Sequence, residues 1–486
     1  MKPNFRALHL DLKGVPPAMP RLLRLMEIAR ESGYNALLVE WEDQFPWREI
    51  RYRNETCYTD DEIRAFHEHA ASLELEVIPL VQCLGHMETW LRIPENKELR
   101  ELPQHVDVLN PLAKGARSLV EGLVDEVLDR TPDCRHFHLG GDEAWTFGHH
   151  PDTKAYIEQH GKGALYLHHV EPILDRLASR GVRPILWHDM MLEWDDAALK
   201  AIAVKADLCV WAYNRFDRKR TPWARALTEA ENSSRPPILE GGGGVPACDT
   251  LFERFRKAGI TMWGAGAYKA GLSDIMYLDV PDPVTRLTNI ADWAVIAGRY
   301  PFAGLVNTAW SRATTDTPQY QPIDAALDLM VACGRIWSGK AAASGDPGNP
   351  DAPWRQHVLD TALSLIEHSG EKERFVRCRD LMERLTRQRR AGWMNAIKSR
   401  ETIACMEADV RRRALLNADK MLGYLKNNLA ALEHLRAEIL DVFRDLVPSI
   451  WMERYCDERM QPLRQEYDEL ANRLQKTATE TSPAPQ

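Results

Sequence analysis

The 486-residue sequence has no Cys-x-x-Cys pair, no long apolar run and no excess of positive charge. Its nine cysteines are an odd number without paired spacing, which predicts reduced thiols. The first residues lack the apolar run of a signal peptide, and no later stretch reaches the apolar length of a membrane span. The net charge of −9 provides no basic field for nucleic acid. We therefore expect a soluble, cytoplasmic protein that binds neither nucleic acid nor membrane.

Short apolar runs alternate with amphipathic stretches along the first two thirds of the chain, as far as Trp310. This alternation predicts parallel strands joined by helices. The expected strands cover residues 8–10, 36–39, 77–81, 137–139, 184–189, 208–213, 260–268 and 305–310. Eight such units favour an α/β fold of the (β/α)8 (TIM) barrel type, in which functional side chains gather at the C-terminal ends of the strands. A doubly wound open sheet is the alternative, because a strand count does not prove closure.

The composition changes after the predicted barrel, which we place at residues 1–338. Residues 339–354 are rich in Ala, Ser, Gly, Asp and Pro, as expected of a linker. Residues 355–476 have helical periodicity and predict a C-terminal all-α domain. We expect this domain either to form a homodimer interface or to cover the side of the barrel. Residues 477–486 are expected to form a disordered tail.

Two adjacent acids, Asp142 and Glu143, follow the fourth expected strand and two glycines, Gly140 and Gly141. The glycines allow a tight turn at the strand end, which would present both carboxyl groups in a loop. A partly buried pair of acids tends to separate its pKa values, so that one group is ionised while the other keeps its proton. The pair is therefore our candidate catalytic site. A solvated loop is the alternative interpretation.

Aromatic residues end several of the expected strands. Trp187, Trp211 and Trp310 end three different strands, and Tyr213 and Tyr268 lie close by. In a barrel these rings would converge on one mouth, where the apolar faces of sugars stack on aromatic side chains. Packing in the top layer of the barrel is the alternative for at least one of them.

A metal site is the rival interpretation of the same strand ends. His86, His138 and His188, with Asp142 and Asp189, have the donor atoms that zinc prefers. None of these histidines has a tight motif spacing to another, and His138 lies inside a strand. We therefore expect no metal and no other cofactor.

Several stretches of the sequence resemble glycoside hydrolase family 20, the β-N-acetylhexosaminidases, and most closely its hexosaminidase D branch. The matching stretches are residues 6–14, 40–47, 79–88, 138–143 and 186–190, with weaker similarity as far as Arg312. The resemblance implies an exo-acting, retaining hydrolase whose partner is a glycan or glycoconjugate ending in β-linked N-acetylgalactosamine or N-acetylglucosamine. It implies that the substrate's own 2-acetamido group is the nucleophile. Glu143 would then protonate the leaving oxygen, and Asp142 would orient the acetamide and stabilise the oxazolinium intermediate.

The resemblance also assigns residues that bind the substrate. Arg6 matches an arginine that binds sugar hydroxyls, and His86 matches a histidine that supports the acids. The acetamide pocket would have Trp187, Trp211 and Trp310 as its walls, with Tyr213 or Tyr268 bonded to the carbonyl.

One position departs from the family pattern. Many relatives carry an acid shortly after the last pocket tryptophan, where it binds the outer hydroxyls, whereas this chain has Ser311 and Arg312 after Trp310. We expect Glu42 or Asp43 to serve instead, with a weak preference for galactosaminides. A carbohydrate-binding barrel without turnover is the alternative from another functional class.

Overall fold

We describe a computed structural model that covers residues 3–213, 245–270, 278–315, 317–342, 353–409 and 417–479, without the side chains of residues 245–250, 478 and 479. Residues 241–244, a run of four glycines, lie outside this part of the chain.

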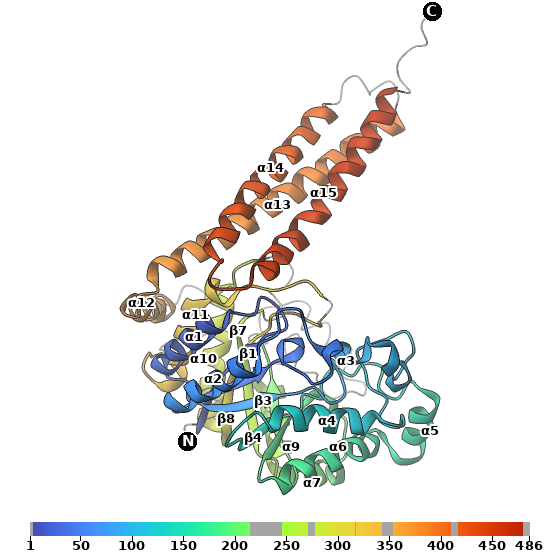
Figure 1. Cartoon of the computed structure of the whole chain (residues 1–486), viewed down its shortest axis with the longest axis vertical. Helices are drawn as coiled ribbons and strands as arrows, with labels where there is room; N and C mark the ends of the chain where they lie inside the picture. Colours follow the sequence, from blue (N-terminus) through green and yellow to red (C-terminus); the bar gives the residue numbers. More distant parts are fainter. Residues whose placement is uncertain are drawn as a thin grey trace, which may run out of the picture. The chain divides into compact units, whose positions relative to one another are not determined.

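Eight parallel strands form a closed barrel in the order β1 to β8 (Figure 1). The strands are β1 (Phe5–Asp11), β2 (Ala36–Glu40), β3 (Glu76–Leu80), β4 (His136–His138), β5 (Arg183–Trp187), β6 (Asp207–Trp211), β7 (Met262–Lys269) and β8 (Phe302–Ala309). The barrel closes where β1 pairs with β8, from Phe5 opposite Gly304 to Leu8 opposite Asn307. The predicted (β/α)8 barrel is confirmed, and the doubly wound sheet is excluded.

Helices surround the strands. They are α1 (Met19–Ser32), α2 (Asp60–Ser72), α3 (Glu88–Leu91), α4 (Ala116–Leu128), α5 (Pro151–His160), α6 (Lys162–Ser179), α7 (Asp196–Ala203), α9 (Val245–Ala258), α10 (Pro283–Arg299), α11 (Leu327–Ser338) and α12 (Pro353–His368). Short 3-10 turns are η1 (Glu42–Gln44), η2 (Ile50–Tyr52), η3 (Pro94–Leu99), η4 (Asp189–Met191) and η6 (Ile323–Ala325). Thr59 and Glu62 form a capping box at the start of α2, where each side chain accepts a hydrogen bond from the backbone N–H of the other residue.

Side chains of alternate strand residues fill the barrel interior. Trp263 closes the end where the strands begin, with its ring stacked 5.2 Å from Phe5. Trp187 lies in the same buried core, with Ile78, Ile185 and Val306. The barrel is therefore packed along its axis, and only its C-terminal mouth is left to form a site.

The chain forms two compact units. The barrel unit extends to Lys372 and includes α12, where Trp354 is buried and the Arg355 guanidinium donates to Thr288 Oγ1 of α10 at 2.6 Å. The predicted start of the helical domain at residue 355 is therefore wrong, because α12 buries its apolar face on the barrel helices. Residues 343–352 of the predicted linker and the end of the tail, residues 480–486, lie outside the described residues.

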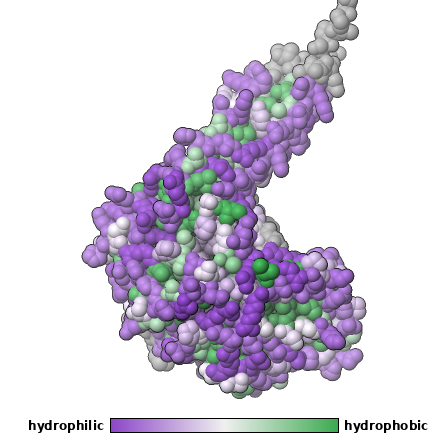
Figure 2. Space-filling view, viewed as in Figure 1, coloured by the Kyte–Doolittle hydropathy of each residue, from purple (hydrophilic) through white to green (hydrophobic). Residues whose placement is uncertain are grey.

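The second unit contains three long helices that run alongside one another, α13 (Lys372–Ala408), α14 (Ala418–Val442) and α15 (Ser449–Thr479) (Figure 1). The prediction that this part of the chain is all helical is confirmed. However, α15 includes residues 477–479, which we had expected in the tail. On the face shown in Figure 2 the surface is mostly hydrophilic, with small scattered apolar patches. Among the described residues no helix has the length and apolar character needed to cross a membrane.

A buried carboxylate anchors residues 278–280 in the helical unit. Asp279 is fully buried, accepts a hydrogen bond from the Tyr455 hydroxyl at 2.8 Å and pairs with Arg459 and Arg389. Burial alone would raise the pKa of Asp279, but the two guanidinium groups outweigh burial and hold this pKa below its usual value.

We expect Asp279→Ala to destabilise the helical unit by about 3–5 kcal/mol, because it removes the buried carboxylate that pairs with both Arg459 and Arg389. Denaturant unfolding followed by circular dichroism measures this loss. Asp441→Ala is the matched control: it removes a solvent-exposed partner of Arg444 and should cost less than about 1 kcal/mol. Equal losses in the two variants would contradict the anchoring role of Asp279.

Candidate active site

A strained loop at the end of β4 presents the acid pair. Gly140 and Gly141 have left-handed backbone angles, with φ of 58° and 81°. A Cβ atom on Gly140 would lie 1.8 Å from Gln82 Oε1, so a side chain there would displace the Gln82 amide, which accepts a hydrogen bond from Gly141 N. Glu143 also has a positive φ, 45°, which is uncommon outside glycine and is often found at functional sites. The predicted turn is confirmed, and it directs both acids to the barrel mouth.

His86 lies between the two acids. Its Nε2 is 3.3 Å from Glu143 Oε2 and 3.7 Å from Asp142 Oδ2. Burial alone would lower the pKa of His86, but the Asp142 and Glu143 carboxylates outweigh burial and raise it to about 10. His86 therefore supplies a positive charge to the acid pair at neutral pH.

Asp142 is almost completely buried, whereas the Glu143 side chain is 30% exposed. Burial raises the pKa of Asp142 well above its usual value, nearby Asp189 and Glu143 add to this, and His86 opposes it. Asp142 Oδ1 has no hydrogen-bond partner among the described residues. The site therefore contains an acceptor that suits a donor group on a ligand.

Asp189, which the sequence suggested only as a possible metal ligand, positions two of the site residues. Its Oδ2 accepts a hydrogen bond from Glu143 N at 2.9 Å, and its Oδ1 accepts one from Trp211 Nε1 at 3.2 Å. Burial raises the pKa of Asp189 to about 6, although these hydrogen bonds oppose the shift. The sequence signal that could have identified this role is the place of Asp189 at the end of the fifth strand, where functional side chains of a barrel gather.

The acids form one side of a pocket of about 230 Å³. Trp211 and Tyr213 are stacked with ring centres 5.3 Å apart, and Trp310 lies edge-on to Tyr213 at 6.2 Å. The pocket is lined by His86, Glu88, Asp107, Asp142, Glu143, Trp145, Trp211, Tyr213, Ala270, Trp310, Arg312, Ala313, Thr314 and Tyr320. An aromatic box thus faces a cluster of acids.

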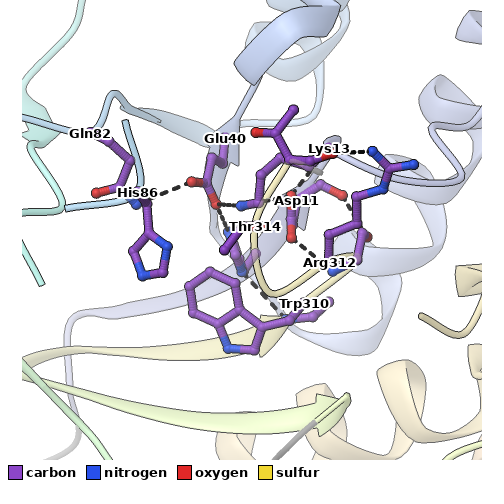
Figure 3. Close-up of polar contacts among 12 residues, drawn as sticks. Asp11, Lys13, Glu40, Gln82, His86, Trp310, Arg312 and Thr314 are labelled. Atoms are coloured by element: carbon purple, nitrogen blue, oxygen red, sulfur yellow. Dashed lines mark hydrogen bonds and ion pairs between the residues drawn. The ribbon is translucent and has the colours of Figure 1, made fainter. Parts of the chain in front are cut away.

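A buried ion-pair network lies behind Trp310 (Figure 3). Lys13 Nζ is 2.6 Å from Glu40 Oε2, 3.1 Å from Asp11 Oδ1 and 5.3 Å from the Trp310 ring centre. Burial alone would lower the pKa of Lys13, but Asp11 and Glu40 raise it. Asp11 Oδ2 also accepts a hydrogen bond from Ser311 N at 2.7 Å. The network therefore fixes the position of the Trp310 wall.

The structure brings together six of the residues expected in the site: His86, Asp142, Glu143, Trp211, Tyr213 and Trp310. Trp187 is not among the pocket-lining residues, because it lies in the barrel core, with its ring 6.2 Å from Trp310 and 4.3 Å from His138. Its expected role as a pocket wall is corrected to packing beneath Trp310.

Two further expectations fail because of strand geometry. Arg6 lies near the start of β1, at the opposite end of the strand from the site, and its Nε donates to Gly33 O at 2.8 Å. Tyr268 follows the inward-facing Ala267, so it points outward, near Cys333 of α11. Of the two candidate tyrosines, only Tyr213 lines the pocket.

Glu42 and Asp43 also do not line the pocket. Both are buried in η1, where Asp43 accepts hydrogen bonds from Gln44 at 2.9 Å and Asn54 at 3.1 Å. Burial raises the pKa of Glu42 well above its usual value. Asp43 holds the loop after β2 through these hydrogen bonds, and neither acid reaches the pocket, so their expected contact with outer hydroxyls is corrected.

In the described part of the chain, one group of side chains remains that could hold a metal ion. Donor atoms of His86, Asp142 and Glu143 lie within 4.8 Å of one another and could surround an ion. His86 must lose its proton before it can bind an ion, and its pKa of about 10 opposes this loss. His138 instead accepts a hydrogen bond from Gly140 N at 2.9 Å, as expected of a core histidine, and His188 does not line the pocket. That the site needs no metal stays a prediction.

Residues 17–222 match the model of the glycosyl hydrolase family 20 catalytic domain. Human hexosaminidase D is 29% identical over 342 residues, which cover 68% of this chain and 65% of the human protein. Bovine hexosaminidase D is 30% identical over 321 residues, which cover 63% of this chain and 84% of the bovine protein. The chain belongs to glycoside hydrolase family 20, and the resemblance found in the sequence is confirmed.

A solved structure, the chitobiase of Flavobacterium johnsoniae, shares the fold with a TM-score of 0.51. It is 13% identical, and the superposition covers 99% of this chain and 74% of the chitobiase.

We expect His86→Ala to raise the pKa of Asp142, because the imidazolium is the nearby charge that lowers this pKa. The carboxyl carbon-13 signal of Asp142, assigned by its loss in Asp142→Asn, reports the titration. His105→Ala, at a half-exposed histidine near Asp107, is the control and should leave the titration unchanged. A downward shift in His86→Ala would contradict the assigned charge of His86.

Proposed function

We propose that this protein is an exo-acting, retaining β-N-acetylhexosaminidase that removes terminal N-acetylgalactosamine or N-acetylglucosamine from a glycan or glycoconjugate. The proposal rests on Asp142 Oδ1, which is buried and has no hydrogen-bond partner among the described residues. Asp142 lies next to the more exposed Glu143 and faces an aromatic box. The names of the human and bovine relatives, hexosaminidase D, agree with this activity.

The position of the acids supports a substrate-assisted mechanism. Ordinary retaining glycosidases place a nucleophile and an acid on opposite sides of the scissile bond. Here Asp142 and Glu143 approach the same nitrogen of His86, at 3.7 and 3.3 Å, and we propose that both face one side of the scissile bond. The acetamide oxygen of the substrate then takes the role of the nucleophile.

In this mechanism the acetamide oxygen attacks C1 while the bond from C1 to the leaving oxygen breaks. Glu143 gives its proton to the leaving oxygen, and the sugar becomes an oxazolinium ion. Asp142, whose ionised form is favoured by the nearby charge of His86, accepts a hydrogen bond from the acetamide N–H and stabilises the positive charge. Water then attacks C1, Glu143 takes up its proton, and the acetamide is restored with retained configuration.

The aromatic box suits the acetamide group. Trp211, Tyr213 and Trp310 present apolar ring faces to the methyl group, and the Tyr213 hydroxyl is the candidate donor to the carbonyl. Substrate and protein together supply nucleophile, acid and charge stabilisation, so we propose that no cofactor takes part.

We also propose that the protein acts in the cytoplasm. Every cysteine whose side chain the structure describes is free, which agrees with a reducing compartment. A homodimer through the helical unit stays a prediction, for which the exposed Trp393, Met394 and Ile397 of α13 offer an apolar surface.

We expect only acetamido sugars to be cleaved when four 4-nitrophenyl β-glycosides are compared. These are the N-acetylgalactosaminide, the N-acetylglucosaminide and their 2-hydroxy counterparts, assayed with and without a strong chelator. Equal cleavage of the 2-hydroxy sugars would refute acetamide participation. Loss of activity in the chelator would favour the metal-dependent alternative, and binding of the sugars without cleavage would favour the carbohydrate-binding alternative.

We expect Glu143→Gln to slow substrates with poor leaving groups by about 10²–10⁴-fold, because it removes the proton donor. Activated leaving groups, which need little protonation, should be affected much less, whereas Asp142→Asn should impair both kinds. Steady-state kinetics on alkyl and 4-nitrophenyl glycosides measure the difference. Glu98→Gln, at an exposed acid outside the pocket, is the control. Equal losses on both substrates in Glu143→Gln would remove Glu143 from the role of acid.

A further inference from the structure

We infer that Glu88 binds a hydroxyl group of the sugar, at the side of the pocket that faces away from the aromatic box. This inference rests on the proposed function and concerns the recognition of the sugar by the same site. It gives Glu88 the role that we had expected of Glu42 or Asp43.

Glu88 is buried but faces the pocket. Its side chain lines the cavity although the residue is only 3% exposed. Its Oε1 has no hydrogen-bond partner in the part of the chain that the structure describes. A buried acceptor without a partner costs free energy, and a ligand that donates a hydrogen bond relieves this cost.

The barrel order places Glu88 away from the acetamide. Glu88 and His86 follow β3, whereas Trp211 and Tyr213 lie at the end of β6, three strands further round the closed barrel. A sugar whose acetamide lies in the aromatic box therefore presents its ring hydroxyls toward the β3 side of the pocket.

The electrostatic surroundings of Glu88 suit a hydroxyl group. Burial raises the pKa of Glu88 to about 7 and Asp107 adds to this, while His86 and Lys13 oppose it. At neutral pH this carboxyl group can therefore either accept or donate a hydrogen bond. A sugar hydroxyl has the same two abilities, so it fits both protonation states.

Other acids near the pocket are less suited to this role. Asp142 and Glu143 are committed to catalysis, and Glu42 and Asp43 do not line the cavity. Asp107 lines it, but its side chain is 34% exposed and so remains available to water. Arg312, which stands where relatives carry an acid, donates to Thr315 O.

The test combines Glu88 variants with deoxy sugars. Hydrolysis of the 4-nitrophenyl N-acetylhexosaminide and of its 3-, 4- and 6-deoxy analogues is measured for wild type, Glu88→Ala and Glu88→Gln. We expect Glu88→Ala to lower kcat/KM on the parent sugar by about 10–100-fold, as for a hydrogen bond to a charged group. On the one deoxy sugar that lacks the bound hydroxyl, Glu88→Ala should lower kcat/KM by less than about 3-fold. The reason is that the variant and the deoxy sugar remove the same hydrogen bond. Glu88→Gln, which keeps an acceptor, should recover part of the loss.

The matched control is Glu98→Gln, whose acid is exposed and outside the pocket. An equal loss on the parent and all deoxy sugars would overturn the inference, since it would mean that Glu88 acts only through His86 or the fold. No loss on any sugar would also overturn it. If the wild type binds the sugars without cleaving them, the proposed function fails, and calorimetric dissociation constants for the same set test Glu88 separately.

Discussion

The Lys13 ammonium group connects the ends of the first two strands, and the geometry of the site depends on it. It lies within ion-pair distance of Asp11 and Glu40, both of which are buried. The ion pairs hold the pKa of Glu40 below its usual value even though burial opposes this. Removing the cation would leave two buried carboxylates at the mouth of the barrel without the ammonium group that both of them contact, which is among the most costly changes in a protein interior.

From Lys13 a continuous set of polar contacts runs round the barrel to both functional parts of the site. In one direction Glu40 accepts a hydrogen bond from Gln82, and Gln82 accepts one from the loop that carries the acid pair. In the other direction Asp11 accepts a hydrogen bond from Ser311, next to the Trp310 wall. The acids and the aromatic box come from distant parts of the sequence, and this network holds them in register.

The site also concentrates backbone strain. Non-glycine residues with left-handed angles include His86, Glu143 and Ala270, all of which line the pocket. Such angles cost free energy and persist only where surrounding contacts enforce them. Here the hydrogen bonds made by Asp189 and Gln82 enforce the backbone angles of the loop that carries the acid pair. The strain lowers the stability of the fold, and the acid pair is held in a fixed position.

The sequence by itself determined the local elements and the chemical centre. Apolar runs defined the eight strands, a capping box defined the start of α2, and the two glycines before Asp142 and Glu143 defined the turn. These features depend on neighbouring residues, so they can be read without knowledge of the fold. The direction of side chains at strand ends could not be read in this way, because it depends on where the barrel closes and on which face of each strand is inside.

Tertiary structure therefore decided which candidates meet. Arg6 matched a family arginine in sequence, yet it lies near the start of β1, and Lys13 occupies the other end. Tyr268 fell on the outer face of β7, and Trp187 fell below the pocket. The positioning role of Asp189 and the place of Glu88 in the pocket became visible only through contacts or cavities formed by distant segments. The physical reason is that burial and hydrogen bonding are properties of the closed barrel, whereas strand and turn propensities are properties of the chain.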